Sequence, residues 1–183
     1  MKHIALAFAL ASAISAHAVE STQVQADKSA INFTYKQMNV AVDGKFKRFS
    51  SQLSFDPAKP GNARTSFDVE LASVDTGAPE GDDEVAGKPW FNTKAFPTAK
   101  FVSTGVKALG GNKYEVTGQL NIKGKTQDVV VPATFTTQGN SGIFEGGFTI
   151  RRADFSIGEG SWAKFDIVAN DVLIKFRITA TSK

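Results

Sequence analysis

The sequence contains no cysteine, and both of its histidines, His3 and His17, lie within the first eighteen residues. Disulfides, thiol catalysis and thiolate metal sites are therefore excluded for the whole chain. If the first eighteen residues are removed, Ser-His-Asp catalysis, haem ligation and ordinary zinc or copper sites are excluded too, because these need an imidazole or a thiolate. Carboxylate or lysine chemistry and cation sites made only of oxygen ligands remain compatible with the composition.

Long apolar runs are also lacking. The run Ile4–Ile14, broken by Ser12, is shorter than the roughly 20 residues that a helix needs to cross a bilayer. It follows a short basic start and precedes Ala16-His17-Ala18, a small-x-small site typical of secretory signal peptides. We therefore expect residues 1–18 to be a signal peptide cleaved after Ala18. The protein would be exported to the periplasm, with secretion as the alternative destination.

Neither sign of charge is in large excess, since 21 basic and 18 acidic residues give a formal net charge of +3. That balance does not favour nucleic acid as a partner. Arg151-Arg152 fits either a solvated face or a contact with an anionic head group, since arginine binds phosphate in a bidentate manner. Asp82-Asp83-Glu84 lacks the spacing of an EF-hand loop and is typical of the acidic start of a short helix. We expect no metal site and no cofactor.

What the chain does contain is regular alternation of apolar and polar residues. In Ile143–Thr181, two alternating stretches, 143–150 and 172–180, flank a glycine-rich loop. Successive side chains of a strand point to opposite faces, so each stretch offers one face to a core and the other to water. We expect this hairpin to close a barrel and its loop to fold over or into one end.

Six more alternating segments precede this hairpin, and a non-periodic stretch of about 74–98 interrupts them. We expect strands at 31–35, 49–55, 63–71, 101–107, 114–122 and 129–136. After Tyr35 the apolar parity slips, which a bulge, a bend or a short turn would explain. Loops as long as 74–98 are typical of lids and binding elements. Within this stretch we expect a helical turn near 82–87. About eight antiparallel strands predict a closed barrel, or an opened or sandwich-like one.

The apolar faces do not decide whether this barrel is hollow. Gly118 lies among valine and leucine, and Gly146 lies between two phenylalanines. Such glycines leave room for a ligand, but alternating large and small residues fit a tapered, filled interior equally well. Five large aromatic residues lie outside the regular strands and favour a lined cavity mouth suited to a long apolar ligand: Trp90, Phe91, Phe96, Phe155 and Trp162.

Nine short motifs follow one another from about Asp27 to the C-terminus. They are Lys28-Ser29-x-Ile31-x-Phe33, Gly44-x-Phe46, Phe55-Asp56-Pro57, Ser73-Val74-x-Thr76-Gly77, Trp90-Phe91, Phe96-Pro97-x-Ala99-x-Phe101-x-Ser103, Gly118-x-Leu120-x-Ile122-x-Gly124, Arg152-x-Asp154-Phe155 and Ile157-Gly158. In this order they resemble the YceI-like family, bacterial periplasmic lipocalin-like proteins that bind polyisoprenoids. The resemblance implies an elongated barrel holding a polyprenyl, quinone or fatty-chain ligand. Many members carry a histidine two or three residues after the position of Tyr35, where this chain has Gln37.

We therefore predict one all-β domain, residues 19–183, folded as a single antiparallel, roughly eight-stranded lipocalin-like barrel with a long loop and short helix at one end. Its predicted function is that of a periplasmic binding or carrier protein for a long-chain apolar ligand, with no catalytic residue. The residues expected to contact the ligand are Phe33, Tyr35, Met38, Phe46, Phe49, Trp90, Phe91, Phe101, Gly118, Gly146, Phe148, Arg152, Phe155 and Trp162.

Three alternatives stay open at this point. Alternation does not say which face points inward, so a small outer-membrane barrel fits the same pattern. A scavenger of hydrophobic toxins or antibiotics would use the same kind of cavity. An enzyme of carboxylate type would use a pair such as Asp154 and Glu159. Transient contact with a membrane and a homodimer are also left open.

Overall fold

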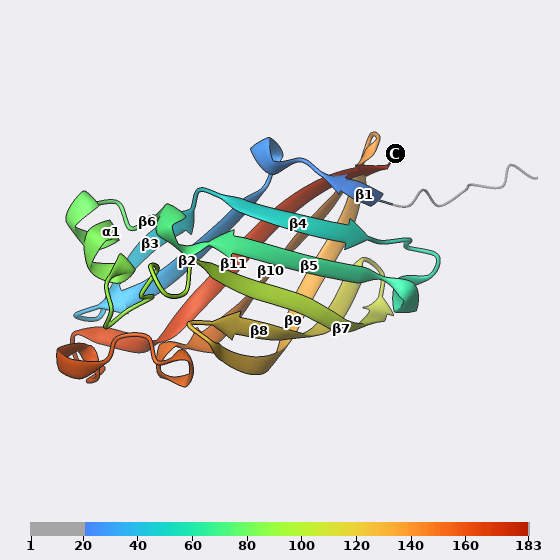
Figure 1. The fold of residues 1–183 in the computed structure, drawn as a ribbon. Helices are drawn as coiled ribbons and strands as arrows, with labels where there is room; N and C mark the ends of the chain where they lie inside the picture. The colour runs from blue at the N-terminus through green and yellow to red at the C-terminus, as the bar shows by residue number, and fades with distance from the viewer. Residues whose placement is uncertain (1–20, 183) are drawn as a thin grey trace, which may run out of the picture.

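The computed structural model describes residues 21–182, in which a long antiparallel sheet curls into an elongated barrel (Figure 1). The predicted signal peptide lies outside the described residues. The strands are β1 (Ser21–Val24), β2 (Ala30–Gln37), β3 (Val40–Phe46), β4 (Phe49–Ser54), β5 (Arg64–Glu70), β6 (Val74–Asp75), β7 (Thr98–Gly110), β8 (Lys113–Ile122), β9 (Lys125–Gln138), β10 (Ser141–Arg151) and β11 (Val168–Ser182). The helices are α1 (Pro79–Ala86) and the short 3₁₀ segments η1 (Ala26–Lys28), η2 (Pro60–Asn62), η3 (Leu71–Ser73), η4 (Arg152–Phe155) and η5 (Gly160–Trp162).

The strands follow the order β4-β5-β7-β8-β9-β10-β11-β2-β3-β6, and every pair is antiparallel. β1 pairs with the end of β11 and lies beside β4, so it joins the two sides of the curled sheet (Figure 1). The predicted antiparallel barrel is confirmed. The eight expected strands correspond to β2, β4, β5 and β7 to β11, while β1, β3 and β6 are additional.

The slip in parity after Tyr35 is a two-residue hairpin turn. Gln37 pairs with Val40, and the turn residues Met38 and Asn39 both have positive φ, 48° and 66°. Two consecutive positive φ angles are typical of the tight turn that matches the twist of the flanking strands. The chain therefore reverses at Met38, and 40–46 forms a strand, β3, instead of an irregular extension of β2.

The apolar face of the sheet points inward and the charged face outward. On the outer face, ion pairs connect neighbouring strands: Lys100 with Asp68 at 3.4 Å between β7 and β5, and Arg177 with Glu145 between β11 and β10. Alternation alone left open which face of the sheet points inward, and the direction in which the sheet curls decides this. In the described residues, no helix has both the length and the apolar composition needed to span a bilayer.

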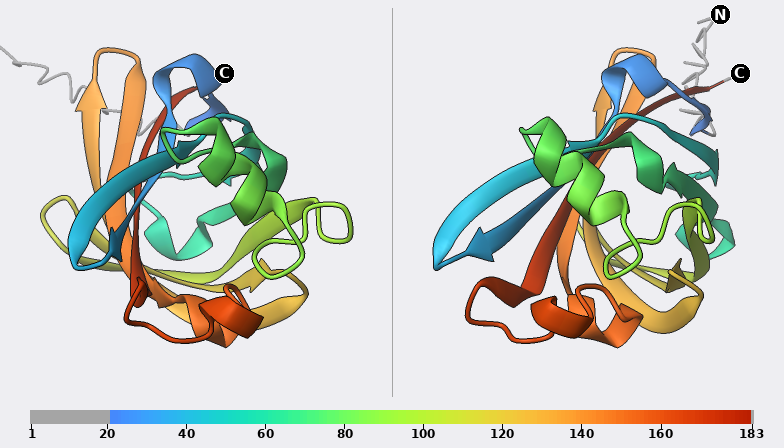
Figure 2. Two further views of the ribbon diagram at one scale, coloured as in Figure 1. Left: turned by 90° about the vertical axis from the view of Figure 1, so that its left-hand side faces the viewer. Right: turned by 60° about the vertical axis from the view of Figure 1, so that its left-hand side comes forward.

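The two ends of the barrel differ. At one end lie α1, the connection that follows it and the loop between β10 and β11, which Figure 2 shows facing the viewer. At the other end lie the tight β7–β8 and β9–β10 turns and η2 (Figure 1). α1 begins with a proline, has Glu80 and Asp82 in its first turn, and therefore complements its own dipole. It overlaps the helical turn predicted near 82–87, but it begins three residues earlier and ends one residue earlier.

Candidate functional site

The interior contains an apolar cavity of about 250 Å³ at the α1 end of the barrel. We call this space the outer chamber. Its wall comes from nearly every strand and from the two loops at that end. Aliphatic and aromatic side chains dominate the wall, and the polar contributions come mainly from Tyr35, Gln37, Thr76, Glu84 and Arg152.

A second cavity of about 170 Å³, the deep chamber, lies further along the barrel and has no polar surface in its lining. Five residues line both chambers: Ile31, Val69, Leu120, Phe148 and Ile174. They form a waist between the two spaces, so the barrel contains one elongated apolar site with two compartments. The interior is therefore hollow. The sequence left a hollow and a filled interior equally compatible with its apolar faces.

An aromatic cluster closes the far end of the deep chamber. The Phe55 ring centroid lies 5.3 Å from that of Tyr114, 4.8 Å from Phe135 and 5.0 Å from Phe144. Edge-on and tilted contacts of this kind are favourable for aromatic rings. We call these four residues the aromatic floor. Because the floor lies at the end with the tight turns, the site has its mouth at the other end, beside α1.

The mouth is where polar groups reach the outer chamber. Gln37 and Glu84 line the chamber and are exposed, so they mark its boundary with solvent. The Trp90 indole N–H donates to the Glu84 carboxylate at 3.2 Å, and the Trp90 and Trp162 rings lie 5.4 Å apart. Two loops that are distant in sequence therefore meet at the mouth through their tryptophans.

Tyr35 places a hydroxyl inside the outer chamber. Among residues 21–182 this hydroxyl has no hydrogen-bond partner, although the ring packs against Phe33 with centroids 6.2 Å apart. Burial raises the pKa of Tyr35, so the group stays protonated and able to donate at neutral pH. An unpaired donor in an apolar wall is suited to an oxygen atom of a ligand.

Arg152 holds the β10–β11 loop together from inside. Only 2% of its surface is exposed, and its guanidinium donates to six backbone carbonyls. The acceptors belong to Ile157, Gly158, Trp162, Lys164, Val168 and Ala169, at 2.8–3.1 Å. Its central carbon also lies 5.5 Å from the Trp90 ring and 5.1 Å from the Phe165 ring. The loop therefore wraps around one cation.

Five N–H groups facing six acceptors leave the Arg152 guanidinium with no free donor. It also has no carboxylate partner among the described residues. Burial lowers the pKa of Arg152, yet an arginine remains charged at neutral pH. Both sequence interpretations of this residue are wrong. Arg152 is not on a solvated face, and its donors are not available to clasp an anionic head group.

The two carboxylates considered for catalysis are held in separate ion pairs. Asp154 accepts from Arg151 at 2.9 Å, and Glu159 accepts from Lys123 at 2.7 Å. The Lys123 ammonium, which is mostly buried, also donates to the Ser156 carbonyl at 2.7 Å and keeps the pKa of Glu159 below its usual value. Neither carboxylate lines a chamber. The geometry therefore supports a role for both in anchoring the loop.

Nine of the fourteen predicted contact residues line the cavity. Phe101 lines the deep chamber only, and Phe148, at the waist, lines both chambers. The other seven line the outer chamber only: Phe33, Tyr35, Phe46, Trp90, Phe91, Arg152 and Trp162. The structure thus brings together aromatic residues from four strands, β2, β3, β7 and β10, and from two loops. Trp90 and Trp162 both line the outer chamber, and their assignment to the ligand entrance stays a prediction.

Five predicted residues do not line the cavity: two glycines, Gly118 and Gly146, and three residues with large apolar side chains, Met38, Phe49 and Phe155. Met38 is 71% exposed in the β2–β3 turn, because the chain reverses there. Phe49 lies on β4, the first strand of the sheet order, and packs against the Phe67 ring of β5 with centroids 6.4 Å apart. Phe155 is 2% exposed and belongs to the solid core around the outer chamber. Apolar side-chain type alone did not distinguish a cavity wall from a core or a turn.

The prediction that Gly118 and Gly146 leave room for a ligand is also wrong. A Cβ at Gly118 would overlap the Phe101 ring, and one at Gly146 would overlap the Phe176 ring. Phe176 lies directly opposite Gly146 across β10 and β11, and Phe101 lies diagonally opposite Gly118 across β7 and β8. Each glycine therefore allows a neighbouring phenylalanine to lie flat against the wall, and the ligand space begins beyond those rings.

We expect Gly118→Ala to lower the free energy of unfolding by about 1–3 kcal/mol, because the new methyl group would overlap both the Phe101 ring and the Val102 carbonyl oxygen. The ring would move into the deep chamber, which it lines. Urea denaturation measures the change. Gly61→Ala is the matched control, since nothing lies within 4 Å of a Cβ there. Equal stability of the two variants would show that Phe101 is not seated on Gly118.

Several wall residues escaped the sequence prediction, and most are aliphatic. Ile31, Val69, Leu120 and Ile174 form the waist with Phe148, and Phe176 lines the deep chamber. All five lie on the inward parity of their strands, which the alternation displays. The signal was therefore present, but selecting by aromatic type passed over it.

A curled antiparallel sheet around an apolar site that is closed at one end defines a hollow β-barrel of the lipocalin type. The chain belongs to the YceI-like family, because residues 23–180 match the YceI-like domain. It is similar to BcnA of Burkholderia cenocepacia, with 45% identity, 87% of this chain and 100% of that chain covered, and a TM-score of 0.85. A UPF0312 protein of Azotobacter vinelandii is 34% identical over 134 residues, covering 69% of this chain and 70% of the relative.

The same fold occurs in a polyisoprenoid binding domain of Saccharophagus degradans that is implicated in plant cell wall breakdown. Identity to that domain is 15%, the TM-score is 0.71, and the match covers 90% of this chain and 99% of that one. At this level of identity the similarity establishes the shared fold.

Proposed function

We propose that the protein is a periplasmic carrier that sequesters one long-chain apolar ligand, a polyprenyl, isoprenoid quinone or fatty-chain lipid, without catalysis. The observation that carries this proposal is the shape of the site: two apolar chambers in line, closed at one end, with polar groups only near the mouth. A long chain with one polar end matches this distribution of surface.

The energetics favour such a ligand. Burial of apolar carbon is worth roughly 0.8 kcal/mol per CH₂, so each five-carbon prenyl unit contributes on the order of 3 kcal/mol. A few units exceed the cost of ordering the chain and immobilising it. The deep chamber offers no polar group to a ligand, and so it favours hydrocarbon alone.

The head of the ligand would lie in the outer chamber. The unpaired Tyr35 hydroxyl supplies a donor there, and Gln37, exposed at the mouth, supplies a donor and an acceptor. A quinone carbonyl or a prenol hydroxyl fits such partners. The binding of polyisoprenoid by a protein that shares this fold agrees with the proposal.

The decisive experiment is to purify the protein after export, extract it with organic solvent and identify the released lipid by mass spectrometry. One long-chain lipid in near-stoichiometric amount supports a dedicated carrier. A wide range of apolar compounds supports a scavenger of toxins or antibiotics, and protein that carries and accepts no lipid contradicts both. N-terminal sequencing of the same sample should begin at Val19 if export and cleavage occur as proposed.

Reloading the delipidated protein with a quinone should quench tryptophan fluorescence, because Trp90 and Trp162 both line the outer chamber and are the only tryptophans. Trp162→Ala should speed ligand release more than it slows uptake, since loss of a contact at the mouth acts mainly on the off-rate. Phe49→Ala, which removes an aromatic ring outside the cavity, should leave both rates unchanged.

A further inference from the structure

Four large apolar side chains are exposed on two adjacent segments at one end of the barrel. Met38 is 71% exposed and Val40 65% in the β2–β3 hairpin, while Phe165 is 48% and Ile167 43% exposed in the β10–β11 loop. We call these four residues the apolar lip. Clustered exposed apolar surface of this kind is typical of an interaction site.

The two segments are held side by side. The Met38 N–H donates to the Ile167 carbonyl at 2.7 Å, and Gln37 is paired with Val168 of β11 on one side and Val40 of β3 on the other. The lip is therefore one surface formed by two connected loops.

The lip is also continuous with the mouth of the cavity. Two residues next to the lip in the chain line the outer chamber: Gln37, which precedes Met38, and Val168, which follows Ile167. Val40 faces the same side of the sheet as Gln37, because the two are paired across the hairpin. A surface that binds this lip would lie at the opening of the ligand site.

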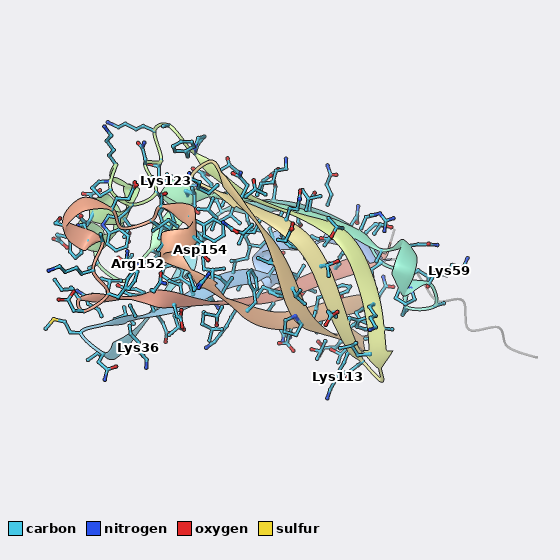
Figure 3. All side chains as sticks on the ribbon, turned by 90° about the horizontal axis from the view of Figure 1, so that it is seen from below. Lys36, Lys59, Lys113, Lys123, Arg152 and Asp154 are labelled. Atoms are coloured by element: carbon cyan, nitrogen blue, oxygen red, sulfur yellow. The ribbon has the colours of Figure 1, made fainter. Side chains whose placement is uncertain are left out.

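Basic residues outnumber acidic ones on the two segments that carry the lip. Lys36 and Lys164 flank it, and in residues 21–182 neither ammonium has an ion-pair partner. Asp166 is the only carboxylate within 36–40 and 163–167, so the two segments carry a positive excess. Figure 3 shows Lys36 at the same end of the barrel as Arg152, opposite Lys113.

We propose that the apolar lip docks on an anionic lipid bilayer and holds the mouth of the cavity against it. The four apolar side chains would enter the interfacial region, while Lys36 and Lys164 would contact anionic head groups. This inference rests on the proposed function for its purpose, since a lipid that is nearly insoluble in water has to be collected from or delivered to a membrane. A bilayer suits apolar tips of loops better than a second copy does, because a stable dimer needs a broad complementary face.

The test measures flotation of the delipidated protein with vesicles of phosphatidylcholine and phosphatidylglycerol in equal parts, compared with phosphatidylcholine alone. We expect binding to the anionic vesicles that weakens with salt. The triple variant Met38→Gln, Val40→Thr, Ile167→Thr should bind at least tenfold more weakly. It spares Phe165, which contacts Arg152, so the loop should keep its fold. Lys36→Gln with Lys164→Gln should remove the salt dependence.

The matched control is the triple variant Val102→Thr, Leu109→Gln, Val130→Thr. These side chains are 42%, 53% and 55% exposed, and they lie on β7 and β9 away from the lip. It should bind vesicles as the parent does. Equal binding by both triple variants, or no vesicle binding by the parent, would overturn the proposal.

Two more measurements separate docking from carriage. Affinity for a short-chain quinone added in solution should be the same in the lip variant and the parent, whereas transfer of lipid from vesicles should slow at least tenfold. If the parent carries no lipid but still floats with anionic vesicles, the carrier function fails and docking stands.

Sedimentation should find a monomer. A dimer that the lip substitutions dissociate, without vesicle binding, would assign the lip to self-association and refute docking.

Discussion

Replacement of Arg152 with methionine should lower the melting temperature by about 10 °C, the largest loss of stability expected from one substitution in this protein. The change removes one cation that satisfies six backbone carbonyls. Leaving buried acceptors unsatisfied costs roughly 1–3 kcal/mol each, although water reaches some of them once the loop opens. A net loss of about 3 kcal/mol corresponds to this shift, at about 2–4 °C per kcal/mol for a domain of this size.

The effect should begin in the β10–β11 loop. Hydrogen exchange should therefore increase first between Ala153 and Ile167, while the strands around the aromatic floor keep their protection. Gly158 supports this expectation, because a Cβ there would overlap the Arg152 guanidinium and its φ is +76°. The loop and the cation are fitted to each other.

Two further variants separate the role of charge from the role of hydrogen-bond geometry. Arg152→Lys keeps the charge but offers three donors instead of five, and it should restore only part of the stability. Arg151→Met is the matched control, because Arg151 is exposed and its pair with Asp154 is a surface ion pair worth less than about 1 kcal/mol. Similar melting temperatures for the two methionine variants would disprove the role assigned to Arg152.

Filling the deep chamber should shorten the ligand that the protein accepts. Ala133 lines the deep chamber, and Ala133→Leu would place three more carbons there. Each excluded prenyl unit loses roughly 3 kcal/mol of burial, so affinity for a long-chain quinone should fall by about 100-fold for every unit displaced. Affinity for a quinone with one prenyl unit should not change, since it would occupy the outer chamber.

Two controls make the result specific to the compartment. Ala99 lines the outer chamber, so Ala99→Leu should weaken short and long ligands together. Ala41 is exposed on β3 and lines neither chamber, so Ala41→Leu should weaken neither. Thermal unfolding of the empty Ala133→Leu protein should be unchanged or slightly higher, because the leucine fills a void. Loss of folding, or equal loss for short and long ligands, would show that the deep chamber does not hold the chain end.

The sequence predicted the strands well where apolar and polar residues alternate without interruption. The 63–71 and 114–122 segments appear as β5 (Arg64–Glu70) and β8 (Lys113–Ile122), because periodicity of two is a local property of the chain. It missed β1 and β6, which have four and two residues and are defined by their partners. β3 was missed because two turn residues, Met38 and Asn39, are enough to reverse the direction of the chain.

The candidate site was predictable in kind but not in detail. Trp90 and Trp162 were selected because they are large aromatic residues outside strands, and both line the outer chamber. Phe155 satisfied the same criterion and is instead packed in the core, since neighbours from other strands surround it. Arg152 continues the inward parity of Phe148 and Ile150, whereas Arg151 has the outward parity. Only the path of the following loop shows that backbone carbonyls enclose the Arg152 guanidinium.

The sequence by itself determined the antiparallel barrel, the two-sided character of its strands and the apolar nature of whatever its interior holds. Whether that interior holds anything was decided only by the tertiary structure. The volume inside a barrel depends on how its strands curl and on where the largest rings lie, and both are set by contacts between strands. Phe101 and Phe176 lie flat because a glycine stands across from each, so the centre stays open. The same glycines and phenylalanines in another register would have filled it.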